Sequence, residues 1–371
     1  MQTMPIKLLL RCQNVGIKSR SIAQTVNMKQ RKSILIDPSY RVFDSDGLFD
    51  LTNPVLNRDG QLLPFFRLRE VMGSEGISVH TADYLFKVVD HDYKQCDYYS
   101  LGLLDNYERV LLESRARLAA FVIMEPPVVF PCLYKSLPKI TAAFDRVYLP
   151  NTTGDGYSLA GVDVSKLHRL YWPIPYDDVH EPYWSNAERM KRVVVINGSH
   201  HPRGGIREQY SLRIKAMVEL SKLNTIDLYG MGWGNRWSRR NLYSAYWLNW
   251  RQIASIYKGS CISKYEVLQN YEFCLCFENM AMDGYITEKL FDCLYAGTIP
   301  LYMGAPNILE YVPAEVFIDC RKYKSWIEMW NDAVNMSAQQ ISEMREAGRT
   351  FLRSDAARKF FNSMINICDG A

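Results

Sequence analysis

The stretch "FENMAMDGYITEKLFDCLYAGTIPLYMG", residues 277–304, gathers polar side chains between two apolar segments. The preceding run "FCLCF" (273–277) is short and apolar, as is typical of a buried strand. From Thr287 the apolar residues repeat at helical spacing until Gly297, and the apolar run "TIPLYM" (298–303) follows. The sequence therefore predicts a strand, a loop, a helix that begins at Thr287 and ends at Gly297, and a second strand.

The polar groups lie where the first strand ends and the helix begins. Glu278 and Asn279 follow the strand, so we expect both to face a cleft at the carboxyl edge of a sheet. Thr287 is a good N-cap, which places Glu288 and Lys289 in the first helical turn. Free N–H groups and the helix dipole attract anions, so we expect a diphosphate beside Lys289. Glu288 would repel phosphate and is expected to accept hydrogen bonds from sugar or ribose hydroxyls. The alternative is a capped helix start with a solvated lysine.

The composition excludes several classes of protein. The chain has 371 residues, enough for two or three domains, and its 48% apolar and 23% charged residues are typical of a folded soluble protein. A net charge of +4 is too small to indicate nucleic-acid binding. The 9 cysteines include no CxxC pair and the 6 histidines form no HxH or HExxH pattern, so neither a disulfide framework nor a metal site is expected. "DSD" (44–46) resembles a metal-binding motif, but Gly47 follows it and a turn is the better interpretation.

Short apolar runs alternate with helix-like segments along the chain, which predicts an α/β fold with parallel sheets. The expected strands of a first Rossmann-like domain are 34–36, 77–81, 96–100, 120–125 and 146–150, with helices at 63–73 and 106–119. Those of a second are 193–197, 225–230, 273–277, 298–303 and 316–319, with helices near 208–221, 252–258, 287–296 and 323–334, and a helical tail over 337–368. We expect domains at 37–175 and 193–345, a Pro- and aromatic-rich linker at 176–192 and a carboxyl-terminal helical segment at 346–371.

The amino-terminal arm, residues 1–36, carries seven Lys and Arg residues before the first acid, Asp37. Such an arm is expected to contact anionic membrane lipid, to hold a polyanionic acceptor or to be a solvated leader. No window approaches the roughly 20 apolar residues of a membrane helix. We therefore expect a cytoplasmic protein with a possible peripheral contact to the inner face of the membrane.

Residues 277–304 resemble the donor-site signature of the α-1,3-fucosyltransferases, glycosyltransferase family 10. The matching pieces are "FEN" (277–279), "YITEKL" (285–290) and "GTIPLYMG" (297–304), all at the family's spacing. Met280 departs from the pattern, because a serine is common there. The resemblance implies a GT-B fold, two Rossmann-like domains that face a central cleft, with the acceptor bound by the first domain and the sugar nucleotide by the second.

The resemblance also implies a reaction and roles for particular residues. The family transfers L-fucose from GDP-fucose to a glycan hydroxyl with inversion, and binds the diphosphate through an arginine on the first helix of the donor domain and the lysine of "TEK". Here these are Arg213, with Arg203 and Arg207 as alternatives, and Lys289. Asn279, Tyr285 and Glu288 are expected to contact the sugar or ribose. These residues do not require a metal or cofactor.

Glu125, in "AFVIMEPPVVFP" (120–131), is the expected general base. It ends an apolar run of the acceptor-side domain, its flanking apolar residues raise its pKa, and the resemblance implies an acid there. The alternative is a glutamate that ends a strand and meets solvent. We expect an oligosaccharide or a lipid-linked glycan as the acceptor, in lipopolysaccharide synthesis or protein glycosylation. The competing functions are transfer from another GDP-sugar and non-catalytic binding of a nucleotide or glycan.

Overall fold

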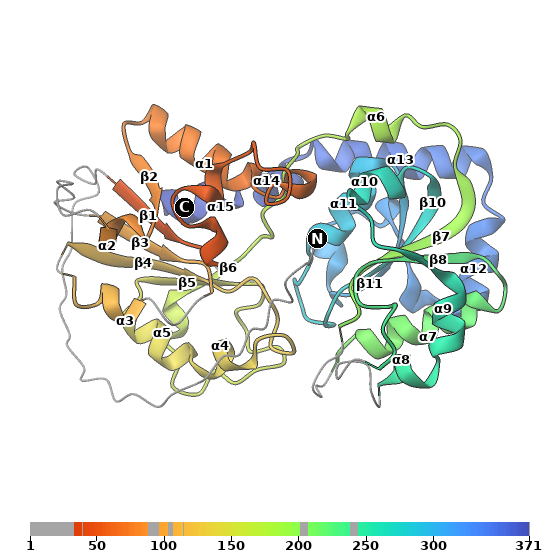
Figure 1. Cartoon of the computed structure of the whole chain (residues 1–371), viewed down its shortest axis with the longest axis horizontal. Coiled ribbons are helices and arrows are strands. Elements are labelled where there is room, and N and C mark those ends of the chain that lie inside the picture. The colour runs from red at the N-terminus through yellow and green to blue at the C-terminus, as the bar shows by residue number, and fades with distance from the viewer. Residues whose placement is uncertain are drawn as a thin grey trace.

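The computed structural model describes residues 33–38, 40–87, 96–102, 107–113, 115–200, 207–237 and 244–370. These residues form two α/β domains that lie side by side (Figure 1). The predicted contact of the amino-terminal arm with a membrane falls on residues 1–32, outside the described part. Within the described part, no helix is long and apolar enough to cross a membrane. The cytoplasmic location stays a prediction.

The first domain is built on a parallel six-stranded sheet in the order β2-β1-β3-β4-β5-β6. The strands β1, β4 and β5 are mostly apolar and buried, because helices cover both faces of the sheet. The strand bounds are β1 Ser33–Asp37, β2 Ser78–Thr81, β3 Cys96–Ser100, β4 Ala116–Val122, β5 Arg146–Leu149 and β6 Leu167–Arg169.

Helices cover both faces of the first sheet (Figure 1). One face packs against α1 (Leu63–Ser74) and, from the far end of the chain, α15 (Ser363–Asp369). The other packs against α3 (Tyr107–Val110), α4 (Pro131–Lys135) and α5 (Leu137–Ala143). The short helix α2 (Tyr84–Lys87) follows β2.

The second domain has a parallel six-stranded sheet in the order β12-β11-β10-β7-β8-β9. Its strands are β7 Met190–Ile196, β8 Ile226–Tyr229, β9 Tyr257–Gly259, β10 Tyr271–Phe277, β11 Ile299–Met303 and β12 Ile318–Asp319. Its helices are α6 Glu181–Trp184, α7 Tyr210–Ser221, α8 Ala245–Leu248, α9 Trp250–Ile256, α10 Lys264–Leu268, α11 Glu288–Ala296, α12 Trp326–Val334 and α13 Ala338–Leu352. α7, α9 and α12 cover one face, and α10, α11 and α13 cover the other.

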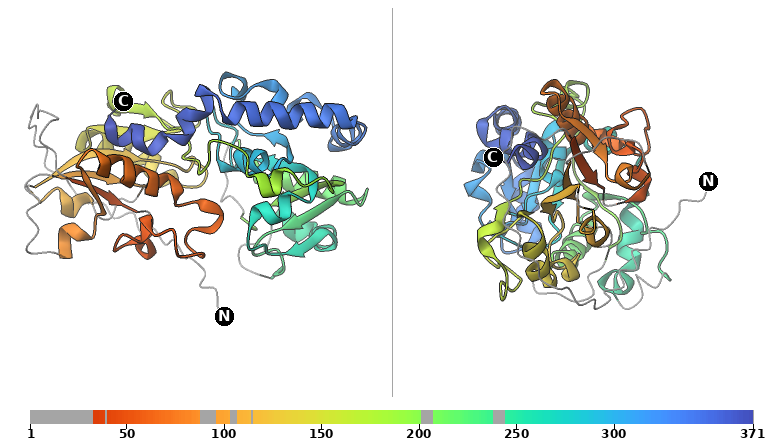
Figure 2. Two further views of the ribbon diagram at one scale, coloured as in Figure 1. Left: turned by 90° about the horizontal axis from the view of Figure 1, so that it is seen from above. Right: turned by 90° about the vertical axis from the view of Figure 1, so that its left-hand side faces the viewer.

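The chain crosses between the domains twice. The first crossing follows β6, and the second follows α13, where α14 (Asp355–Phe361) leads into α15 on the first domain. Figure 2 shows these carboxyl-terminal helices along one side of both domains. The first domain is therefore completed by the last helix of the chain.

The predicted α/β class with two Rossmann-like parallel sheets is confirmed. Several local predictions are wrong. The helix predicted over 106–119 stops at Val110, because Ala116 and the residues after it pair with β3 as strand β4. The same strand ends at Val122 rather than at residue 125. β6 and β9 were not predicted, because each has only 3 residues.

The predicted domain limits cut through elements of the structure. β1 begins at Ser33, inside the predicted arm, and β7 begins at Met190, inside the predicted linker. α13 continues through residue 345, where the second domain was predicted to end. In each case polar or charged residues within the strand or helix resemble a connecting segment in the sequence.

Candidate active site

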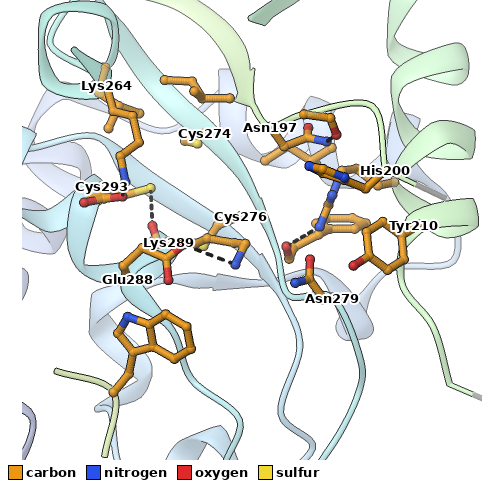
Figure 3. Close-up of a pocket in the computed structure, with 18 of the residues that line it drawn as sticks. Asn197, His200, Tyr210, Lys264, Cys274, Cys276, Asn279, Glu288, Lys289 and Cys293 are labelled. Atoms are coloured by element: carbon orange, nitrogen blue, oxygen red, sulfur yellow. Dashed lines mark hydrogen bonds and ion pairs between the residues drawn. The ribbon is translucent and has the colours of Figure 1, made fainter. Parts of the chain in front are cut away.

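A pocket of about 260 Å³ lies between the domains, at the carboxyl ends of the second sheet's strands. Most of its wall comes from β7, α7, β10, α11 and the segments next to them (Figure 3). Glu125 and Trp172, which precede β7 in the chain, also line it. The predicted residues Glu125, Arg213, Asn279, Glu288 and Lys289 all line it. Such an edge is where open parallel sheets bind ligands.

The start of α11 is organised by Glu278, which is 0% exposed. Its carboxylate accepts hydrogen bonds from the Thr287 backbone N–H and hydroxyl, both at 2.8 Å. Thr287 in turn caps α11 by accepting the Lys289 N–H, as predicted, and Gly297 ends the helix with a φ of 69°. The expectation that Glu278 faces the cleft is wrong, because the carboxylate turns inward to hold the loop.

Lys289 projects from the first turn of α11 into the pocket (Figure 3). Its Nζ lies 2.9 Å from Thr287 Oγ1 and 3.4 Å from Glu278 Oε2. Burial opposes the charged form, but the nearby carboxylates of Glu288, Glu278 and Glu125 outweigh it and raise the pKa of Lys289. The ammonium group is therefore a fixed positive charge at neutral pH.

Glu288, beside this lysine, offers a buried acceptor. Within the described part of the chain its Oε2 has no hydrogen-bond partner. Burial alone raises the pKa of Glu288, but Lys289 and Lys264 outweigh it and lower the pKa below the ordinary value. An ionised carboxylate oxygen without a partner in a pocket wall suits a hydroxyl donor from a ligand.

Arg213 lies on α7, across the pocket from α11, and is 4% exposed. Its Nη2 donates to the backbone carbonyls of Phe277 at 2.6 Å and Glu278 at 3.3 Å, and its guanidinium lies 5.4 Å from the ring centre of Tyr210. Arg213 and Lys289 thus approach one pocket from two helices. A planar guanidinium and an ammonium in that arrangement suit a diphosphate.

The two alternative arginines differ from Arg213. Arg203 lies outside the described residues. Arg207 forms an ion pair with Asp155 of the first domain and does not line the pocket.

Glu125 follows β4 in the first domain, three residues beyond the end of the strand. Its Oε2 accepts hydrogen bonds from the Tyr285 hydroxyl at 3.2 Å and from Asn279 Nδ2 at 3.5 Å. Burial raises the pKa of Glu125, and Glu288 adds to the rise, while Lys289 and the two hydrogen bonds limit it. A carboxylate with a raised pKa, across the pocket from two cations, is suited to accept a proton.

Asn279 and Tyr285 were predicted to contact the sugar or ribose, and both hold the Glu125 carboxylate. Tyr285 is 1% exposed and lies beneath the pocket wall rather than in it. Burial raises the pKa of Tyr285 far above its ordinary value, so the phenol stays a donor.

Sequence reasoning missed several residues of the pocket. Tyr210 lies in the wall at the start of α7. Lys264 of α10 and Asp292 of α11, which form a part-buried ion pair, also line it. Asn197 and His200 come from the segment after β7 (Figure 3). Asp292 lies one helical turn after Glu288, so both residues are on one face of α11. This spacing could have predicted Asp292 as a pocket residue.

The thiols of Cys274, Cys276 and Cys293 line the far wall and are buried, as predicted for the first two. In the described ranges no group of three His, Cys, Asp or Glu residues is arranged to hold a metal ion. The "DSD" segment forms the predicted turn, with Asp46 at a φ of 63° and hydrogen-bonded to His80 and Thr81.

Residues 205–342 match the family model described as glycosyltransferase family 10 (fucosyltransferase) C-term. The chain carries a family 10 fucosyltransferase domain. The matched segment contains Arg213 and the whole of the α11 region, so the family assignment and the pocket rest on the same residues.

Among curated proteins, the chain is 30% identical over 175 residues to mouse GDP-fucose protein O-fucosyltransferase 3, covering 47% of this chain and 31% of that one. It is 38% identical over 66 residues to Helicobacter pylori alpha-(1,3)-fucosyltransferase FucT, 18% of this chain and 14% of that one. The aligned segments therefore span less than a third of these relatives.

The fold is similar to that of the N-terminal domain of Candida albicans trehalose-6-phosphate phosphatase, with a TM-score of 0.54, 10% identity and coverage of 95% of this chain and 100% of that one. The two facing parallel-sheet domains have the predicted GT-B architecture.

Proposed function

We propose that this protein transfers L-fucose from GDP-fucose to a hydroxyl group of a glycan acceptor. One observation carries the proposal: a first-domain carboxylate, Glu125, and two second-domain cations, Arg213 and Lys289, line a single pocket. The family 10 domain and the fucosyltransferase relatives support fucose as the sugar.

In the proposed donor complex, Arg213 and Lys289 bind the diphosphate from opposite sides. The positive end of α11 adds to their field, because Thr287 and Glu278 hold the first turn in place. The unpartnered Oε2 of Glu288 accepts a ribose hydroxyl. Asn279, at the pocket surface, is placed to contact the fucose as well as Glu125.

Glu125 acts in this scheme as the general base. It takes the proton of the acceptor hydroxyl while the acceptor oxygen bonds to the anomeric carbon, and the bond from that carbon to the phosphate oxygen breaks. GDP leaves with the electron pair, and Arg213 and Lys289 balance its charge. Attack from the side opposite GDP inverts the anomeric centre. The scheme uses no metal ion, so a chelator should leave the rate unchanged.

A donor and acceptor screen tests the proposal. GDP-fucose and GDP-mannose are each incubated with N-acetyllactosamine-type oligosaccharides, a lipid-linked glycan and a Ser/Thr peptide, and products are identified by mass spectrometry and NMR. We expect transfer from GDP-fucose to a glycan, as an α-1,3 linkage. Transfer from GDP-mannose alone, fucosylation of the peptide alone, or GDP binding without any transfer would each contradict it.

A further inference from the structure

A cluster of tryptophans surrounds Arg236 in the second domain: Trp237 lies in the segment before α8, Trp247 on α8 and Trp250 at the start of α9 (Figure 1 shows the two helices). The Arg236 guanidinium lies 5.0, 4.9 and 4.6 Å from the ring centres of Trp237, Trp247 and Trp250. The exposed Leu248 follows Trp247 at the end of α8. We call these five residues the tryptophan patch.

The tryptophan patch exposes large apolar side chains to solvent. Trp237 is 68% exposed and Leu248 is 73% exposed. The three cation–π contacts to one guanidinium help to hold the indoles in place, because each such contact is favourable and limits rotation. Large apolar side chains exposed in this way are typical of an interaction site.

The stretch of sequence that carries the patch is basic. The sequence has no Asp or Glu between Asp227 and Glu266. Arg236 lies at the centre of the patch, and the exposed Arg251 lies 5.9 Å from the ring centre of Trp250. The occupant must therefore offer both negative charge and an apolar layer.

An anionic lipid surface has both properties. Indole rings and guanidinium groups settle at the level of lipid headgroups, where an apolar body and a polar edge are both satisfied. Leu248 has no hydrogen-bonding group for a soluble polyanion, whereas an acyl boundary buries it favourably. We propose that the tryptophan patch docks this protein on an anionic membrane surface.

The patch is attached to the wall of the pocket. Tyr246 of α8 donates a hydrogen bond to the Trp233 carbonyl, and Trp233 Nε1 donates to the Asn197 carbonyl at 2.7 Å. Asn197 lines the pocket. Docking through the patch would therefore hold the pocket close to the lipid surface, within reach of an acceptor carried there.

Vesicle binding tests this without donor or acceptor, so its outcome is independent of the proposed transfer reaction. The full chain is floated with phosphatidylcholine vesicles and with phosphatidylcholine–phosphatidylglycerol vesicles. We expect binding to the anionic vesicles only. The double variant Trp237→Ser with Leu248→Ser should lower partitioning about tenfold, from lost apolar burial. Arg251→Ser should lower it about fivefold, from one lost charge near the surface.

Matched controls lie far from the patch. The double variant Val55→Ser with Leu112→Ser removes side chains that are 79% and 87% exposed on the first domain, and Arg358→Ser removes an exposed charge from α14. These should bind like the unmodified protein, and circular dichroism should show every variant folded. Undiminished vesicle binding by the patch variants would overturn the inference. This result is expected if the arm at residues 1–32 alone binds lipid. Equal binding to neutral vesicles, or binding of heparin without binding of vesicles, would also overturn the inference.

Discussion

Carboxylate and cationic side chains lie close together in the pocket. Glu125, Glu278 and Glu288 all lie near Lys289, and the structure gives each a different partner. Glu278 accepts hydrogen bonds from Thr287, and Glu125 accepts them from Tyr285 and Asn279. Glu288 has one buried carboxylate oxygen that has no hydrogen-bond partner in the described part of the chain. Carboxylates with different surroundings can take different roles in one site.

Replacing Glu125 by Gln should lower the turnover number about 10²–10⁴-fold, the usual contribution of a general base. The amide keeps the shape of the side chain, so GDP affinity should stay unchanged in calorimetry. Glu315→Gln, at an exposed position, is the control and should change neither quantity. Undiminished turnover of the Glu125 variant would exclude this residue as the base.

The pH dependence of the rate should reflect the raised pKa of Glu125. The base acts when ionised, so the rate should fall as the pH drops through this pKa, at a pH above the ordinary glutamate range. The Tyr285 hydroxyl lowers this pKa by bonding to the carboxylate. Tyr285→Phe should therefore move the acid limb of the pH–rate profile to higher pH, and an unmoved limb would argue against Glu125 as the titrating group.

Arg213→Ala and Lys289→Ala should each weaken GDP binding by about 1–3 kcal/mol, the cost of losing a charge-assisted contact. Lys215→Ala is a matched control, because this lysine lies on the same helix as Arg213 but is exposed. Titration calorimetry measures all three. The diphosphate assignment fails if the Arg213 and Lys289 variants bind GDP as tightly as the control.

At the scale of an element, the start of α11 carries both the cap of the helix and residues of the pocket. The buried Glu278 carboxylate and the Thr287 cap fix its first turn, and Gly297 in a left-handed conformation ends it. At Gly297 a Cβ atom would lie 2.9 Å from the Trp184 ring, so only glycine fits without a shift.

Thr287→Ala should lower the free energy of unfolding by about 2 kcal/mol or more. Loss of a helix cap costs about 1 kcal/mol, and a buried carboxylate that loses its donor adds to the cost. Ser337→Ala removes the exposed N-cap of α13 and should cost only the roughly 1 kcal/mol of a lost helix cap. Urea denaturation compares the two, and equal costs would show that the Thr287–Glu278 bond adds no stability.

At the scale of the whole molecule, the domains meet through side chain to backbone contacts. Arg169 of β6 donates to the Gly284 carbonyl at 2.6 Å, and the Asp283 N–H donates to Asp155 at 2.8 Å. Both contacts involve the loop between β10 and α11. The orientation of the domains is thus coupled to the loop that carries the donor-site residues.

Because α15 packs on the first domain, a core substitution in this last helix should destabilise the first domain. Ile367 is 2% exposed and packs in the core that α1 covers. Ile367→Ala should lower the free energy of unfolding by about 2–5 kcal/mol, through lost burial and a cavity. Asp369→Ala, at an exposed position of the same helix, is the control. Hydrogen exchange should show the loss in β1 and β3, and a loss confined to the second domain would contradict this packing.

The sequence by itself determined the local pattern. Apolar runs predicted the strands, and "YITEKL" with Gly297 predicted α11 and its caps, because neighbouring residues decide strand burial, helix starts and helix ends. Only the tertiary structure decided which polar groups meet. Glu125 and Tyr285 are 160 residues apart, and no local rule predicts their bond. Glu278 and Asn279 are adjacent, yet one turns into the core and the other into the pocket, because a side chain's environment depends on what packs against it.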